Sequence, residues 1–383
     1  MVTSTTLLEY QEKANSIASA LSLPSFKYGQ GMTLRFDHLD VESAFEQLRT
    51  SAQQQTLTIN TPSSVIVKPL SSFPVSFIQQ YGYTLLPPSE HKLLASHHAS
   101  HHQPMVIHIP ACVKLLEPIR IQSHVTQRTT AESIIIIADE ESDALIIEES
   151  SSTEACALKT QTIQIYLKPH ATVNYCSVQL FHHATHNWSW KRSQHQKDAV
   201  MRWIDSSKST IFSQMQICSL LEHEGSSSEQ YTFFANASET VSDYAIEAVH
   251  TAHSTSSKLL ARGIIDNHGK GIYRGTVTIK NNAPHSRGLQ RVDSLLLGPK
   301  ARCDAVPVLD VEHDDVICSH SAALHQIQNE ELYYLCSRGV PEEEARQMIM
   351  EGFFQSLWDI IPSSVREMIP SSVSEVITTW QRK

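Results

Sequence analysis

The 383-residue sequence lacks the short motifs that mark the common enzyme classes. It has no P-loop, no GxSxG and no HExxH, and its glycine-bearing segments ARGIIDNHGKG and KNNAPHSRG do not form a dinucleotide fingerprint. Its seven cysteines form no CxxC pair and no short disulfide framework, and their odd number favours a reducing compartment. The sequence therefore predicts no self-contained enzyme.

Positive charge and long apolar runs are also scarce. The formal net charge of −10 argues against broad electrostatic binding to nucleic acid or anionic lipid. The longest apolar run is SIIIIA, far short of the roughly 20 residues that a membrane helix needs. The N-terminal stretch MVTSTTLLEYQEKANS shows no basic segment followed by an apolar one, as a secretory signal would. We therefore expect a soluble cytoplasmic protein that binds neither nucleic acid nor membrane.

What is present falls into three regions. Residues 1–63 show helical spacing of apolar residues, first from Leu7 to Leu21 and again after Asp40, which can cap the segment VESAFEQL. Residues 64–327 are rich in short β-branched runs, and residues 328–383 turn helical again. We expect an N-terminal helical region, a β core and a C-terminal helical domain with these boundaries.

The β-rich region contains runs such as SVIVKPL, SIIIIA and QTIQIYL, with few signs of helix between them. Two of its segments, LKPHATVNYCSV (167–178) and LGPKARCDAVPV (297–308), resemble each other as a turn followed by alternating positions. Recurrent turn–strand units indicate a solenoid, and an antiparallel sandwich is the alternative that also gives many short strands. Apolar residues at successive positions favour parallel strands covered on both faces.

The C-terminal region predicts a helix over VPEEEARQMIMEGFFQSLWDII, with Pro341 and three glutamates at its N-terminal end. Phe354 and Trp358 form an apolar stripe beside a longer one, and one helix rarely buries both stripes against its own domain. The two short segments that follow, PSSVREM and PSSVSEVITTWQRK, predict two further short helices. The longer stripe comprises Ala345, Met348, Ile349, Gly352, Phe353 and Leu357.

The stretch VICSHSAALH places Cys318 and His320 two residues apart, so in a strand they share a face. Thiolate and imidazole both suit iron or zinc, but two ligands are too few for a tight site. The alternative is an inert thiol beside a surface histidine. Elsewhere we interpret SHHASHHQ (96–103) as a polar connection and the tryptophans of HNWSW (186–190) as packing on a β face. Cysteines 112, 156, 176 and 218 are interpreted as core residues in strands.

Residues 261–354 resemble the SufB/SufD family of iron–sulfur cluster assembly proteins. The resemblance rests on several motifs in the correct order: GIYRGTVTI, LLLGPKA, VPVLDV, the acid pair before CSH, and ELYYLCSRGV followed by EEEARQMI. It implies a right-handed parallel β-helix flanked by helical domains. It also implies that a SufB-like and a SufD-like chain pair through their β-helices, that each binds the ATPase SufC through C-terminal helices, and that a cysteine desulfurase system supplies sulfur.

The resemblance gives roles to particular residues. Cys318 and His320 would lie near the contact with SufB, where they could hold a transient iron–sulfur cluster, while this chain alone binds no cofactor tightly. Arg338 would hold the turn before the docking helix, and a homodimer is an alternative assembly for the isolated chain. The residues expected to dock the ATPase are Phe353, Phe354, Leu357 and Trp358.

Between the two types of chain, the sequence is more similar to SufD. SufB-like chains carry a cysteine directly after the LLxGxK turn and a glutamate after the family's histidine, whereas this chain has Ala301 and Ser321 there. Cys303 is out of register with the former. SufD-like chains usually have glycine after CSH and again near His325, so Ser321 and His325 leave the local turn conformation open. We expect a non-catalytic SufD-like subunit.

Two other functions are weighed. A SufB-like scaffold that assembles a cluster by itself is disfavoured by Ala301 and Ser321. A β-helix enzyme acting on polysaccharide would need paired carboxylates on one face, and adjacent residues such as Asp314 and Asp315 would point to opposite faces of a strand.

Overall fold

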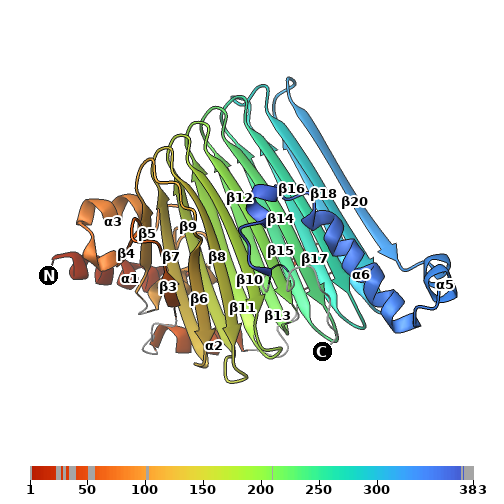
Figure 1. Cartoon of the computed structure of the whole chain (residues 1–383). Coiled ribbons are helices and arrows are strands. Elements are labelled where there is room, and N and C mark those ends of the chain that lie inside the picture. The colour runs from red at the N-terminus through yellow and green to blue at the C-terminus, as the bar shows by residue number, and fades with distance from the viewer. Residues whose placement is uncertain are drawn as a thin grey trace.

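The computed structural model describes residues 2–22, 27–28, 32–33, 40–50, 57–100, 103–208, 210–371 and 374. Its N-terminal part is made of helices and short strands (Figure 1). These elements are α1 (Val2–Ala20), β1 (Lys27–Tyr28), β2 (Met32–Thr33), α2 (Val41–Thr50), β3 (Leu57–Asn60), β4 (Ile66–Pro69), the 3₁₀ turn η1 (Leu70–Ser72), α3 (Val75–Tyr81) and α4 (Lys92–Ala99).

Sixteen strands, β5 to β20, follow without an intervening helix, and three helices end the described chain. The strands are β5 (Met105–Ile109), β6 (Ile119–Val125), β7 (Thr129–Ala138), β8 (Asp143–Ser152), β9 (Leu158–Leu167), β10 (Thr172–Leu180), β11 (His186–His195), β12 (Val200–Lys208), β13 (Phe212–Leu221), β14 (Ser227–Asn236), β15 (Val241–His250), β16 (Ser256–Ile265), β17 (Lys270–Ile279), β18 (Arg287–Leu296), β19 (Arg302–Val311) and β20 (Ile317–Gln326). The helices are α5 (Asn329–Ser337), α6 (Glu342–Trp358) and α7 (Ser363–Arg366).

The strands form a parallel β-solenoid of about eight turns. Odd-numbered strands from β5 to β19 lie in one nine-stranded sheet and even-numbered strands from β6 to β20 in the other, so each turn of the chain adds one strand to each sheet. Every pairing between these strands is parallel, for example β11 with β13 and β16 with β18. The sequence-based solenoid is therefore confirmed, and the antiparallel sandwich is wrong.

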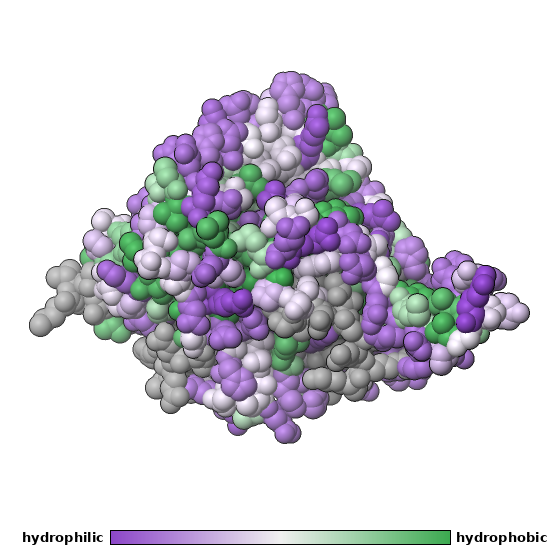
Figure 2. Space-filling model, viewed as in Figure 1, coloured by the Kyte–Doolittle hydropathy of each residue, from purple (hydrophilic) through white to green (hydrophobic). Residues whose placement is uncertain are grey.

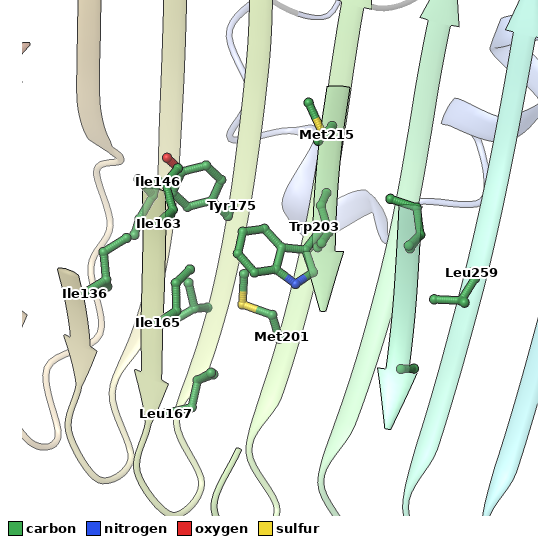
Figure 3. Packing of buried hydrophobic residues seen from close by; sticks show 14 of the residues in the cluster. Ile136, Ile146, Ile163, Ile165, Leu167, Tyr175, Met201, Trp203, Met215 and Leu259 are labelled. Carbon is green, nitrogen blue, oxygen red and sulfur yellow. The ribbon is translucent and has the colours of Figure 1, made fainter. Parts of the chain in front are cut away.

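The interior is filled by alternate residues from both sheets, which meet in one apolar cluster. Figure 3 shows Ile163, Ile165, Tyr175 and Trp203 packed side by side in this cluster. Isoleucine and aromatic residues suit such positions because branched and ring side chains pack well on a pleated surface. The strands are mostly ten residues long, longer than the apolar runs that the sequence analysis detected.

A repeated corner keeps the turns in register. Six non-glycine residues with a φ between 54° and 62° lie at equivalent corners, and the backbone N–H of each donates to a carbonyl in the next turn of the solenoid. His170 N, for instance, donates to the Lys197 carbonyl at 2.8 Å. This conformation is uncommon outside glycine, so the inter-turn hydrogen bonds offset its cost. The six residues are Cys112, Glu141, His170, Asp198, Ser254 and His285.

The N-terminal helices cover the outer face of the odd-numbered sheet. The predicted stripe of α2 is confirmed, since Val41, Phe45 and Leu48 are buried, and the Asp40 carboxylate accepts from the Ser43 N–H at 3.1 Å as a cap. Phe45 packs edge-on against Trp188, at 5.6 Å between ring centroids, so the HNWSW tryptophans do pack on a β face. At this end β3 and β4 add antiparallel to β6 and β5.

Three interpretations of the sequence need correction. The segment 96–103 is not a polar connection, because residues 96–99 belong to α4 and His97 and His98 are buried there, while 101–102 lie outside the described residues. The similar segments 167–178 and 297–308 enclose different corners, one entering an even-numbered strand and the other an odd-numbered strand. Cys112 is an exposed corner residue rather than a strand residue, and Cys156, although buried, lies between β8 and β9.

The last described elements of the chain are only partly those that the sequence predicts. The short helix predicted over PSSVREM is present as α7, whereas residues 372–373 and 375–383 of the second one lie outside the described residues. No helix within the described ranges has the length and apolar character required to cross a bilayer.

Candidate functional site

The two ends of the solenoid differ. At the N-terminal end the short strands β3 and β4 and the first helices cover the sheets, whereas β19 and β20 are the last strands of their sheets. Within the described part of the chain, no strand pairs with their outer edges. Each presents ten residues whose unpaired backbone groups form a template for another strand. The open end therefore differs from the covered one in offering edges to which further strands could add.

Cys318 and His320 lie on β20 at this open end. Cys318 packs against the interior cluster, and its Sγ is 3.5 Å from the position that a Cβ on Gly288 would occupy. Two residues along the same face, His320 is exposed. β20 is thus the strand that the sequence predicted, and Cys318 and His320 share its inward face in the last turn of the solenoid.

The chemistry of the pair is limited in the isolated chain. Burial raises the pKa of the Cys318 thiol, so a metal ion would have to displace its proton. Among the described residues no group of three or more His, Cys, Asp or Glu side chains is arranged to hold a metal ion. A site at this end would therefore need ligands from another molecule, in addition to this thiol and imidazole.

Cys303 lies elsewhere in the same turn of the solenoid. It is buried on β19, and its Sγ is 3.2 Å from the Ser294 hydroxyl. Burial raises its pKa to about 11, although the contact with Ser294 opposes this. It therefore behaves as a core thiol.

The apolar residues of α6 are placed differently from the sequence prediction. Phe354, Leu357 and Trp358 are buried against outward-facing residues of the even-numbered sheet, where Phe233 contacts both aromatic rings. The Phe354/Trp358 stripe thus faces the solenoid, together with Leu357 of the longer stripe and Met350. As direct docking contacts these three side chains are unavailable in this conformation.

Arg338 and Phe353 remain accessible to different degrees. Arg338 is exposed in the turn between α5 and α6 and lies 5.3 Å from the ring of Tyr334. Phe353 is half-buried between the Arg262 guanidinium, at 4.6 Å from its ring, and the His325 ring of β20, at 6.3 Å. Arg262 also donates to the Phe353 carbonyl, which fixes α6 on the sheet.

Helix α5 projects from the open end and buries none of its residues. Tyr333 and Tyr334 are 77% and 58% exposed there. Figure 2 shows apolar residues grouped at this end of the molecule, in the region of α5. Exposed aromatic residues on a helix without a packed face mark a surface for another protein. Sequence analysis quoted these tyrosines within a motif without assigning them a role.

Sequence analysis also missed a network of charged residues inside the solenoid. The Lys191 ammonium is fully buried, 2.6 Å from Asp205 and 3.8 Å from Glu148. Lys159 pairs with Glu132 at 2.9 Å. Burial acts to raise the pKa of Glu148, but Lys191, Lys159 and two hydrogen bonds outweigh it and the pKa is lowered. The network is enclosed, so we assign it to the packing of the core and not to a site.

Asp314 and Asp315 do not form a carboxylate pair for hydrolysis. Both lie in the turn between β19 and β20 rather than in a strand, and Asp315 is 2.8 Å from His285 as an ion-pair partner. Asp314 and Asp315 therefore do not supply the carboxylate pair that the polysaccharide hypothesis needs.

Residues 120–353 match the family model described as SUF system FeS cluster assembly, SufBD core domain. The chain is 23% identical over 360 residues to the iron–sulfur cluster assembly protein SufB of Bacillus subtilis, which covers 92% of this chain and 76% of that one. It is 28% identical over 289 residues to a SufBD family protein of Staphylococcus epidermidis, covering 74% of this chain. The aligned region spans 62% of the staphylococcal protein.

Proposed function

The chain belongs to the SufBD family of iron–sulfur cluster assembly proteins, and we propose from this premise that it is a non-enzymatic SufD-type subunit of an assembly complex. It pairs with a SufB-like chain at the open end of a right-handed solenoid. Its projecting C-terminal helices hold a SufC-type ATPase, which supplies ATP hydrolysis. The iron–sulfur cluster is the cargo of the complex, formed where the two solenoids meet.

The observation that carries this proposal is the asymmetry of the solenoid ends. One end is covered, and the other presents two uncovered parallel strands with Ile317 and Leu324 exposed at 65% and 55%. A chain of the same architecture can continue both sheets there by adding strands with the same spacing. A second copy of this chain is the competing occupant, and the mass of the purified complex distinguishes the two.

Assignment to the SufD type rests on the sequence at the family's SufB positions. Ala301 and Ser321 stand where SufB-like chains carry cysteine and glutamate, and Cys303 is buried rather than available at the open end. The names of the relatives do not separate the types, since one is a SufB and others are named only as SufBD family proteins. A SufB-like scaffold remains the alternative.

Cys318 and His320 are the candidate cluster contacts of this chain. They lie on the last strand, so the first strand of a docked partner would cover them. Two ligands from this chain, completed by partner residues or by sulfide, would suit a cluster that is held only transiently. The pair thus supports assembly rather than storage.

For the ATPase, we replace part of the predicted docking surface. Phe354, Leu357 and Trp358 support α6 from beneath, and Arg338 and Phe353 stay in the proposed contact. Exposed Tyr333 and Tyr334 of α5 complete it.

The test is co-expression of this chain with a SufB-like chain and a SufC-type ATPase, followed by anaerobic reconstitution. The variant Cys318→Ser with His320→Ala should lower iron and acid-labile sulfide per complex, while all subunits still co-purify. Cys112→Ser is the matched control, because Cys112 is an exposed cysteine away from the open end. Full cluster formation by the double variant would remove the proposed role of the pair. A stable, stoichiometric cluster on the isolated chain would instead favour the SufB-like scaffold.

A further inference from the structure

Gln290 lies directly next to His320 in the interior of the solenoid. It is on β18, and the parallel register pairs it with His320 of β20. Its side chain is fully buried, with 0% exposure, although it is only one strand away from the open end. Neighbouring strands are about 4.8 Å apart, so a glutamine can reach the imidazole of the adjacent strand through a change of rotamer.

The amide of Gln290 has no hydrogen-bond partner among the residues that the structure describes. Both its Nε2 and its Oε1 are buried in this state, as is the Tyr273 hydroxyl, which also has no partner within the described ranges. Nε2 lies 1.8 Å from the place where a Cβ on Gly275 would be, so the amide occupies space that only a glycine leaves. A buried amide without partners costs stability, which an apolar residue would avoid.

Gln230 shows what a structural glutamine looks like in the same row of interior positions. It lies on β14 and is equally buried, but its Nε2 donates to Asp205 at 2.9 Å and to Thr232 at 3.1 Å. The two glutamines therefore differ in what they contact, and only Gln290 faces the last turn of the solenoid with neither amide atom engaged.

We propose that Gln290 is a positioning residue for His320 in the assembled complex. Its Oε1 accepts the N–H of one imidazole nitrogen, which leaves the other nitrogen unprotonated and directed at the iron–sulfur species. A partner strand docked on β20 drives the exposed ring inward, toward the amide. The inference rests on the proposed role of Cys318 and His320, and it extends the site one strand into this chain.

The first test is the isosteric variant Gln290→Met in the isolated full-length chain. Its midpoint of thermal unfolding should equal or exceed that of the wild type, because a buried amide without partners is removed. The matched variant Gln230→Met should unfold at a lower temperature, since it deletes a donor to Asp205. A fall of more than about 3 °C for Gln290→Met would show that the amide has a structural partner, and would overturn the inference.

The second test is a double-mutant cycle in the reconstituted complex, with iron and sulfide per complex as the measured quantity. Gln290→Met should lower the yield about tenfold, as loss of an outer hydrogen bond to a ligating histidine does. In a His320→Ala background it should have no further effect, because Gln290 acts through His320. A yield equal to wild type for Gln290→Met, or additive losses, would refute the positioning role and leave the proposed function intact. If His320→Ala itself keeps full yield, the role of the pair fails and the Gln290 inference fails with it.

Discussion

Replacing Lys191 tests how the interior of the solenoid is stabilised. Its ammonium is 0% exposed and pairs with Asp205 and Glu148, while the Tyr175 hydroxyl donates to Glu148 at 3.0 Å. Lys191→Met keeps most of the side-chain volume and removes the ammonium charge. It leaves two carboxyl groups in the core that have lost their shared cation. Removing one partner of a buried pair costs about 3–5 kcal/mol, and we expect a loss of that size at pH 7.

The variant should also lose more stability than the wild type as pH rises. In the wild type the pKa of Glu148 is lowered, so its contribution is present above the unfolded-state pKa of 4.5 and is lost as pH falls. Lys191 is the largest cause that lowers the pKa of Glu148, and it also lowers the pKa of Asp205, which burial already raises in the wild type, so Lys191→Met raises the folded-state pKa of both carboxyl groups. A raised folded-state pKa makes a contribution to stability that is lost as pH rises. The deficit of Lys191→Met should therefore be larger at pH 8 than at pH 5.

Urea unfolding of the isolated chain at pH 5 and pH 8 measures both effects. Lys197→Met is the control, because Lys197 is exposed in the next corner and should change the free energy of unfolding by less than about 0.5 kcal/mol. Adding Glu148→Gln and Asp205→Asn to Lys191→Met should recover most of the loss, since no uncompensated charge then remains. A Lys191→Met chain that stays within about 1 kcal/mol of the wild type at both pH values, close to the range of surface substitutions, would refute the buried network as described.

Two further predictions concern acid stability and the ATPase contact. Burial lowers the pKa of His195 to about 3 and of His250 to about 4, so the unfolded chain binds protons that the folded chain excludes. The free energy of unfolding should therefore fall as pH drops below about 6.5, by about 2 kcal/mol per histidine at pH 5. Urea unfolding of the His195→Gln and His250→Gln double variant should show a flatter pH profile. Tyr333→Ala with Tyr334→Ala should reduce capture of the ATPase in a pull-down without lowering chain stability, whereas Leu116→Ala, at another exposed apolar residue, should leave capture unchanged. Capture by a chain truncated after Gln328, which lacks both α5 and α6, would contradict the contact.

The sequence predicted the first and last turns of the solenoid better than the middle ones. Strands such as β7 and β9 contain visible isoleucine runs, and β19 and β20 lie in the motifs of the family resemblance. Between them, β11 to β16 carry polar residues at interior positions, among them Lys191, Asp205 and Gln230. An inward-facing ion pair removes the apolar alternation that marks a half-buried strand, so these strands are hidden from pattern analysis.

The orientation of α6 shows a different limit of the sequence. Both of its stripes are apolar, so the pattern alone does not say which one packs against the solenoid. The outcome depends on the outward residues of the even-numbered sheet, where Tyr231 and Phe233 receive Phe354 and Trp358. Arg262, which pairs with Asp293 at 3.5 Å and stacks on Phe353, then holds the helix in that rotation. The contacts of α6 with Arg262 and Phe233 join residues from about 90 to about 125 positions apart and leave no local signal.

Ser321 and His325 are the two departures from the family pattern near Cys318. Ser321 and His325 both lie within the regular strand β20, so the side chains at these positions are accommodated without a turn. In a strand that directs Cys318 and His320 inward, odd-numbered residues point outward, and the His325 ring indeed contacts Phe353 of α6. The departures therefore alter the face that α6 covers, whereas the interior face that carries the candidate pair keeps its geometry. A comparison of variants should accordingly find that His325→Gly changes the seating of α6 and leaves Cys318 and His320 in place.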